Sequence, residues 1–222
     1  MVENYVRFLE EEMMLKRVEA DALPMAKYMK GQFDFYGVKS PLRKSICQMA
    51  NKKFPIKDID EVKEVVNILW TKSFRELQYA AIDLLVRKKK GLKNEDLPWI
   101  EELIESKSWW DTVDGLAPNV AGYLFDKDRA ILTKYVHLWR SAPSIWLKRS
   151  SLICQLRFKD TVDTPLLFET IDYLCDSKEF FVNKAAGWAL RQYSKFEPVQ
   201  VRDYIGSRSL HPLVVREGSK YI

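Results

Sequence analysis

A short run of tryptophan and aspartate residues, KSWWDTVDGLAP, is the most unusual part of the sequence. If this segment is helical, Asp114 lies one turn beyond Trp110 and shares its face, whereas Trp109 points elsewhere. A carboxylate beside an aromatic ring suits a cationic substrate or a transition state that develops positive charge. The simpler alternative is a core tryptophan next to a surface aspartate, and spacing alone favours that alternative. Asp111 follows Ser108 by three residues, so we expect it to take part in a helix cap.

A second tryptophan lies among cations. Lys184, Trp188 and Arg191 are spaced to share one helix face, and burying this face would bury two charges with it. Arg149 lies in residues 134–159, which contain six bases and no acid. An arginine without a nearby carboxylate is suited to binding phosphate, unless its partner is distant in the sequence.

The common catalytic signatures are absent. The sequence contains no GxSxG, Walker, GxGxxG or HExxH motif. It has two histidines, and its three cysteines form no CxxC pair, so we expect neither a metal nor a cofactor. A reaction in this protein would have to rely on carboxylates, aromatic rings and cations.

The composition is that of an ordinary soluble protein of 222 residues, with 47% hydrophobic and 30% charged residues. No apolar run is long enough to span a membrane, and the acidic N-terminal segment does not resemble a signal peptide. With three cysteines, an odd count, we expect reduced, buried thiols and a cytoplasmic location. The net charge of +5 is unevenly distributed, which favours an anionic partner, although a solvated helix face would give the same pattern.

Helical periodicity runs through nearly the whole chain, and no segment alternates as a strand does. In residues 73–88 the apolar positions Leu77, Ala81, Leu84 and Leu85 fall on one helix face. Similar helices are predicted to begin at four serines, and each serine is a candidate N-cap: Ser73, Ser108, Ser141 and Ser177. The intervals between successive serines are 35, 33 and 36 residues. Ser73 and Glu76, like Ser108 and Asp111, have capping-box spacing.

One further helix fits between successive members of this series. Two helices per repeat predict an all-α fold, a right-handed α-solenoid of HEAT-like helix pairs, with about a dozen helices in a single domain over residues 1–222. The second helices of such pairs line a concave surface, and the basic and aromatic residues described above lie in them. A basic groove that also presents aromatic rings suits a nucleic acid backbone.

The chain resembles the AlkD-type DNA alkylation-repair glycosylases over essentially its whole length. The resemblance depends on the order and spacing of KYMKGQFDFYGVKSPLRK, SWWDTVD, WLKRSSLICQL and FFVNKAAGWALRQYSK. It implies a HEAT-like protein that removes cationic N3- and N7-alkylated purines from duplex DNA. It assigns the catalytic W-x3-D pair to Trp110 and Asp114, a second aromatic wall to Trp188, a phosphate contact to Arg149 and an N-terminal DNA contact to Tyr28. All five residues are present, whereas paralogues without activity have lost part of the set.

The implied chemistry is consistent with the residues. An alkylated purine is already cationic and leaves easily, so a strong general acid is unnecessary, and Asp114, Trp110 and Trp188 would stabilise an oxocarbenium-like sugar. The resemblance implies that the enzyme holds the duplex through its backbone without flipping the base, and no lysine is singled out for lyase chemistry. We expect a monomer with duplex DNA containing alkylated purines as its partner, no membrane contact, and further phosphate contacts from Lys148, Arg157, Lys184 and Arg191.

Two other functions fit the same residues. A catalytically silent paralogue would bind DNA through the same groove, and only base release separates it from an enzyme. A HEAT scaffold would bind an acidic protein partner, and weak salt dependence of DNA binding would favour it.

Overall fold

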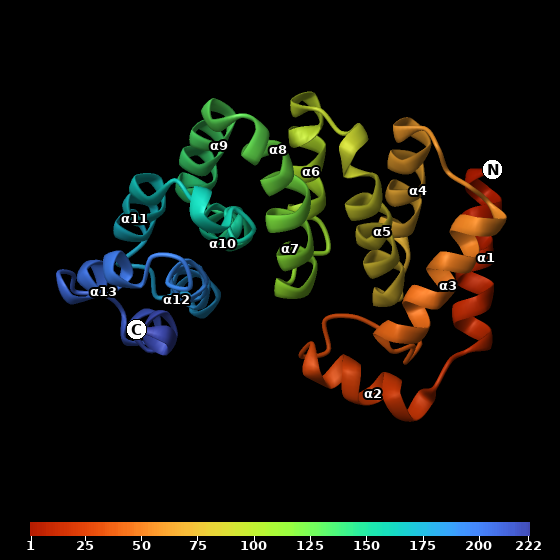
Figure 1. Ribbon diagram of the computed structural model, residues 1–222. Helices are drawn as coiled ribbons and strands as arrows, with labels where there is room; N and C mark the ends of the chain where they lie inside the picture. Colours follow the sequence, from red (N-terminus) through yellow and green to blue (C-terminus); the bar gives the residue numbers. More distant parts are fainter. The chain divides into compact units, whose positions relative to one another are not determined.

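The computed structural model describes the whole chain, Met1–Ile222, and every regular element in it is helical (Figure 1). The one strand-like feature is an isolated bridge between Asp34 and Phe74. The all-α prediction is therefore confirmed. The chain divides into two compact units, Met1–Leu92 and Lys93–Ile222, so a single domain over residues 1–222 stays a prediction. None of the helices has the length and apolar character needed to cross a lipid bilayer.

The first unit contains α1 (Val2–Leu15), α2 (Glu19–Tyr28), α3 (Ser40–Lys53), α4 (Ile59–Thr71) and α5 (Arg75–Lys88), followed by a short 3-10 turn, Lys89–Gly91. Its core forms where α1, α3, α4 and α5 pack against one another. The predicted apolar face of α5 is buried in this core: Leu77, Ala81, Leu84 and Leu85. Helix α2 contributes only Ala22 to the buried surface, because its remaining side chains are partly or fully exposed.

The start of α5 is held differently from the predicted capping box. Ser73 lies outside the helix, and no side chain caps the N-terminus of α5. The Glu76 carboxylate instead accepts hydrogen bonds from the backbone N–H groups of Tyr36, Gly37 and Val38, at 3.1, 2.9 and 3.0 Å. Burial raises the pKa of Glu76, and these three hydrogen bonds oppose the shift by stabilising the carboxylate. Glu76 therefore fixes the segment that joins α2 to α3.

The second unit contains α6 (Leu97–Glu105), α7 (Trp110–Leu116), a π-helical turn (Ala117–Ala121), α8 (Gly122–Lys127), α9 (Arg129–Ser141), α10 (Ile145–Ile153), α11 (Thr164–Tyr173), α12 (Phe180–Tyr193), α13 (Pro198–Gly206) and α14 (Pro212–Gly218). Three 3-10 turns complete it, at Asn94–Asp96, Lys159–Thr161 and Ser219–Tyr221. Helix α10 packs against α7, α9 and α12, and α12 packs against α14.

The repeat is more regular in the structure than in the serine series. Helices α5, α7, α10 and α12 begin at Arg75, Trp110, Ile145 and Phe180, each 35 residues after the one before. Residues at the same position of successive helices are therefore equivalent, a relation that becomes important at the candidate site.

The serines themselves do not open these helices. Ser108, Ser141 and Ser177 lie outside α7, α10 and α12, and α10 is capped instead by Ser144. Helix α7 has no side-chain cap, so the capping box expected from Ser108 and Asp111 is wrong. The spacing is informative because each serine lies two to four residues before a helix begins, near a helix boundary where short polar residues are favoured.

The three cysteines are free thiols, as expected. Cys47 and Cys154 are buried, and burial raises the pKa of each thiol to about 12. Cys175 is exposed, so the prediction of a buried thiol is wrong at this position.

Candidate active site

The two adjacent tryptophans have different surroundings. Trp110 is the first residue of α7 and is partly exposed, whereas Trp109 precedes the helix in extended backbone. The Trp109 ring packs against Trp146 of α10 at 5.5 Å and Phe181 of α12 at 5.2 Å between ring centroids. Trp109 therefore belongs to an aromatic cluster with residues of α10 and α12, a role that the sequence left open. Trp110 lies one helical turn before Asp114 on α7.

The α-helical hydrogen-bond pattern changes shortly after Asp114, at the end of α7. Pro118 lies four residues after Asp114 and has no N–H to donate to the Asp114 carbonyl, and the chain forms a π-helical turn over Ala117–Ala121. The Asn119 side chain replaces the missing donor, because its Nδ2 lies 2.9 Å from the Gly115 carbonyl and 3.4 Å from that of Asp114. The Asn119 side chain therefore holds the C-terminal part of α7, which carries Asp114, through hydrogen bonds.

Asp114 and Arg149 form a two-bond ion pair. Arg149 Nε donates to Asp114 Oδ1 at 2.8 Å, and Arg149 Nη2 donates to Asp114 Oδ2 at 2.9 Å. The third guanidinium nitrogen, Nη1, donates to the Phe181 carbonyl at 2.7 Å. Such a planar fork fixes the plane of a carboxylate as well as its position. This pair therefore links α7, α10 and the first turn of α12.

Burial and charge act in opposite directions on Asp114. Its side chain is 18% exposed and that of Arg149 is 4% exposed. Burial raises the pKa of the Asp114 carboxyl above its ordinary value, Arg149 opposes the shift, and the neighbouring charge of Asp111 adds to it. The result is a largely buried carboxylate, paired with Arg149, on a side chain that keeps 18% of its surface exposed.

The structure corrects the surroundings expected for Arg149. The sequence offers no carboxylate near it, but Asp114 lies 35 residues earlier and accepts two of its hydrogen bonds. Its side chain is 4% exposed, and each guanidinium nitrogen donates one hydrogen bond, two to Asp114 and one to the Phe181 carbonyl. Of the two alternatives, phosphate or a distant partner, the geometry favours the distant partner.

Lys184 and Arg191 also have an unexpected partner. Both lie on α12 on either side of Trp188, which is partly exposed. Lys184 Nζ lies 2.8 Å from Glu217 Oε1, and Arg191 Nη1 lies 2.9 Å from Glu217 Oε2. The two cations predicted to contact DNA are thus organised around one acid of α14, which sequence reasoning missed.

The remaining predicted DNA contacts lie at the surface. Lys148 is partly exposed and lines a hollow of about 290 Å³ with Arg140, Ser141, Tyr173, Leu174 and Ser177. Arg157 is exposed and its Nε donates to Asn119 Oδ1 at 3.2 Å. Tyr28 ends α2 in the first unit and is 69% exposed.

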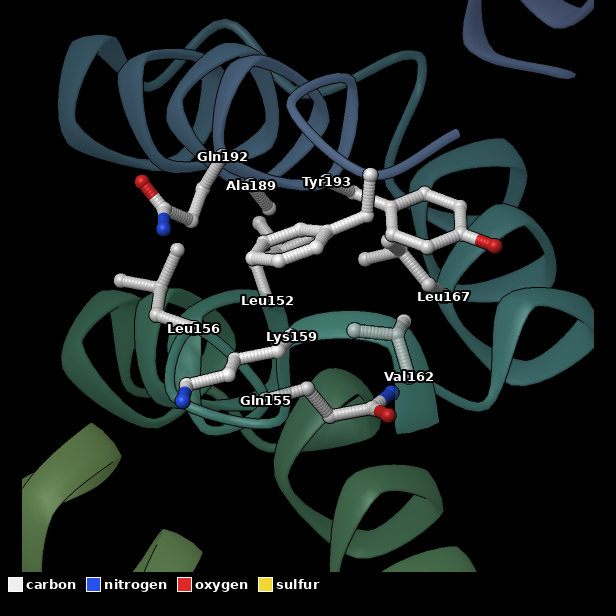
Figure 2. A pocket seen from close by; sticks show the side chains of 10 residues that line it. Leu152, Gln155, Leu156, Lys159, Val162, Leu167, Ala189, Gln192 and Tyr193 are labelled. Atoms are coloured by element: carbon white, nitrogen blue, oxygen red, sulfur yellow. The ribbon is translucent and has the colours of Figure 1, made fainter. Parts of the chain in front are cut away.

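Trp110, Asp114 and Trp188 do not line the hollow between α10, α11 and α12. This hollow, lined by Leu152, Leu156, Leu167 and Tyr193 among others, measures about 10 Å³ (Figure 2). That volume accommodates about one water molecule and not a nucleobase. The chain also contains no group of histidine, cysteine and acidic side chains placed to hold a metal ion.

Comparisons with known proteins show the family of the chain and support its fold. A family model described as DNA alkylation repair enzyme matches residues 9–222. A predicted DNA alkylation repair enzyme of Enterococcus faecalis has 32% sequence identity and a TM-score of 0.86 over 93% of this chain and 96% of that one. No curated protein gives a significant match.

Two structures from Streptococcus mutans share the fold at 17% identity. One is AlkD2, with a TM-score of 0.67 over 100% of this chain and 99% of that chain. The other is smu.31, with a TM-score of 0.62 over 82% of this chain and 96% of that chain. The family match extends over nearly the whole sequence, and the E. faecalis structure covers both units at 32% identity, so the chain belongs to the family of DNA alkylation repair enzymes.

Proposed function

We propose that this protein is a DNA glycosylase that hydrolyses the N-glycosidic bond of N3- and N7-alkylated purines in duplex DNA. The observation that carries the proposal is the Asp114 carboxylate, desolvated, fixed by Arg149 and one helical turn beyond Trp110. Membership of a DNA alkylation repair family supplies the substrate class.

The chemistry needs electrostatic help more than proton transfer. A purine alkylated at N3 or N7 carries a positive charge, so the base leaves as a neutral molecule without a general acid. The sugar becomes oxocarbenium-like, and a carboxylate that is already oriented stabilises that charge without reorganising. Such stabilisation contributes about 10²–10³ in rate for one well-placed group. The partly exposed Asp114 side chain also orients the attacking water.

The aromatic rings and cations complete the proposal. Trp110 and Trp188 present electron-rich faces to the cationic sugar and base. Tyr28, Lys148, Arg157, Lys184 and Arg191 contact the DNA backbone, and the lesion stays outside any base pocket. We propose a monofunctional, monomeric enzyme without a cofactor, because the mechanism requires no lysine nucleophile and no metal.

The experiment is release of 7-methylguanine and 3-methyladenine from methylated duplex DNA, compared between the wild type and Asp114→Asn. We expect release by the wild type and a loss of at least about 10²-fold in the variant, with duplex binding retained. Full activity of Asp114→Asn would disprove the role of the carboxylate. Duplex binding without release by either protein would identify a DNA-binding family member with no glycosylase activity.

A further inference from the structure

One buried acid gathers four cations at the C-terminal end of the chain. The Glu217 side chain on α14 is 4% exposed, and its Oε1 lies 2.8 Å from Lys184 Nζ. Its Oε2 lies 2.9 Å from Arg191 Nη1 and 2.8 Å from Lys220 Nζ, and Arg216 Nε is 3.9 Å from Oε1. Four bases and one acid leave this cluster with a net charge of +3.

A glycine in the middle of α12 makes this arrangement possible. Gly187 lies three residues after Lys184 and four before Arg191, so all three share one helix face. A Cβ atom on Gly187 would lie 2.6 Å from the Glu217 Cβ. The absent side chain lets Glu217 enter between the two cations, with one carboxylate oxygen toward each. Glycine is a poor residue for a helix interior, and this contact explains its presence.

The cations keep capacity for a second anion. A lysine ammonium has three N–H donors and an arginine guanidinium has five, and Glu217 engages only part of them. Lys184, Arg191 and Lys220 remain partly exposed in spite of their bonds to Glu217, and Trp188 lies on α12 between the first two. Fixing long side chains in advance lowers the entropy lost when they bind a ligand. Glu217 lowers the net charge of the cluster by one but holds its donors in place.

We propose that Glu217 is a positioning residue that holds Lys184 and Arg191, with Lys220, to bind phosphates of the duplex backbone beside Trp188. The inference rests on the proposed function, because it takes DNA as the ligand. It adds a residue that makes no contact with DNA and acts through the cations around it. It also assigns Lys220 to the phosphate-binding group.

The sign of one substitution separates positioning from simple neutralisation. Glu217→Gln keeps the size of the side chain and removes one negative charge. If Glu217 only neutralised its neighbours, the variant would bind duplex DNA more tightly, because the protein becomes more positive. If Glu217 positions the cations, the Kd for undamaged duplex rises roughly tenfold, about the effect of one charge-assisted contact. Asp203→Asn, an equal charge change at an exposed residue of α13, is the matched control and should not weaken binding.

A second variant tests the same point without any change in charge. Gly187→Ala changes no charge but displaces Glu217 together with the Val214 backbone of α14, so we expect weaker duplex binding and a salt slope of log Kd flattened by about one. In a background that already carries Lys184→Gln, Arg191→Gln and Lys220→Gln, Glu217→Gln should have little further effect, because it acts through those three cations. If Glu217→Gln does not fold, Gly187→Ala carries the test.

The outcomes distinguish this inference from the proposed function. A wild type that binds no duplex DNA overturns both. A wild type that binds duplex and releases alkylated purines, together with Glu217→Gln and Gly187→Ala variants that bind as tightly as Asp203→Asn, overturns the positioning role alone.

Discussion

Asp114 and Arg149 work as one unit at the scale of single residues. The carboxylate receives two of the guanidinium donors, and the third donor is anchored on the Phe181 carbonyl. An aspartate held in this way needs no reorganisation when positive charge develops on the sugar, which is where a preorganised site gains its advantage. Because Arg149 is buried, its contribution comes through Asp114.

Replacing Arg149 with lysine tests this division of roles. The variant keeps a positive charge beside Asp114 but loses the planar fork, so the carboxylate is less firmly oriented. We expect kcat for 7-methylguanine release to fall about tenfold to a hundredfold, part of the ~10²–10³ available from one such group. Duplex binding, measured in parallel, should change little. Lost binding with unchanged kcat would instead identify Arg149 as a phosphate ligand.

The acid side of the pH profile depends on the same carboxylate. In the proposed mechanism Asp114 acts in its ionised form. Burial raises the pKa of Asp114, so we expect protonation and loss of activity at higher pH than for an ordinary aspartate. The midpoint should therefore lie above the ordinary value of about 3.9. Single-turnover release across the acidic range, corrected with Asp114→Asn for spontaneous depurination, measures it. A midpoint at or below the ordinary value would mean that Arg149 dominates over burial.

At the scale of elements, close helix packing holds the site together. Gly122 at the start of α8 approaches α10, and a Cβ there would lie 2.3 Å from the carbonyl oxygen of Cys154. The Cys154 carbonyl oxygen is a backbone atom, so no side-chain rotation can relieve the clash. Helix α10 carries Arg149, and its distance from α7 determines whether the pair with Asp114 forms.

Gly122→Ala should destabilise the protein, although alanine is the better helix former. Propensity alone predicts stabilisation by about 1 kcal/mol, but overpacking typically costs about 1–3 kcal/mol. Gly206→Ala is the matched control, because nothing lies within 4 Å of a Cβ at that helical position. Urea unfolding of both variants measures the difference. A Gly122→Ala protein as stable as Gly206→Ala would contradict the close approach of α8 to α10.

The elements were predictable from the sequence where the cause is local. Apolar spacing located the helix at Leu77 and Leu85, and the repeat spacing located the helices that carry Asp114 and Arg149. The ion pair was missed, although the signal existed: both residues are the fifth of their helix, and equivalent positions in adjacent repeats are neighbours. Capping by Ser73 was wrong for another reason, since the tertiary fold determines which donors approach a carboxylate.

At the scale of the whole molecule, the positive charge that a partner can reach depends on ion pairs as well as on the number of bases in the sequence. The chain carries a net charge of +5, but many of its bases are engaged by acids. Lys148 retains no such partner, whereas Arg149 beside it is fully engaged. Counting bases in the sequence therefore overestimates the cations available to an anionic partner, and the structure reduces the set to those whose donors still reach solvent.

That reduced set determines how steeply duplex binding depends on salt. If Lys148, Arg157, Lys184, Arg191 and Lys220 each neutralise one phosphate, the slope of log K against log salt is about −4.5, from about −0.9 per contact. Titration of undamaged duplex at several salt concentrations gives this slope. Lys148→Gln should flatten it by about one, whereas Arg149→Lys should leave it unchanged, because a buried guanidinium releases no counterion. A slope near zero would contradict the proposed DNA interface and favour a scaffold that binds an acidic protein, since counterion release accompanies any close contact with phosphates.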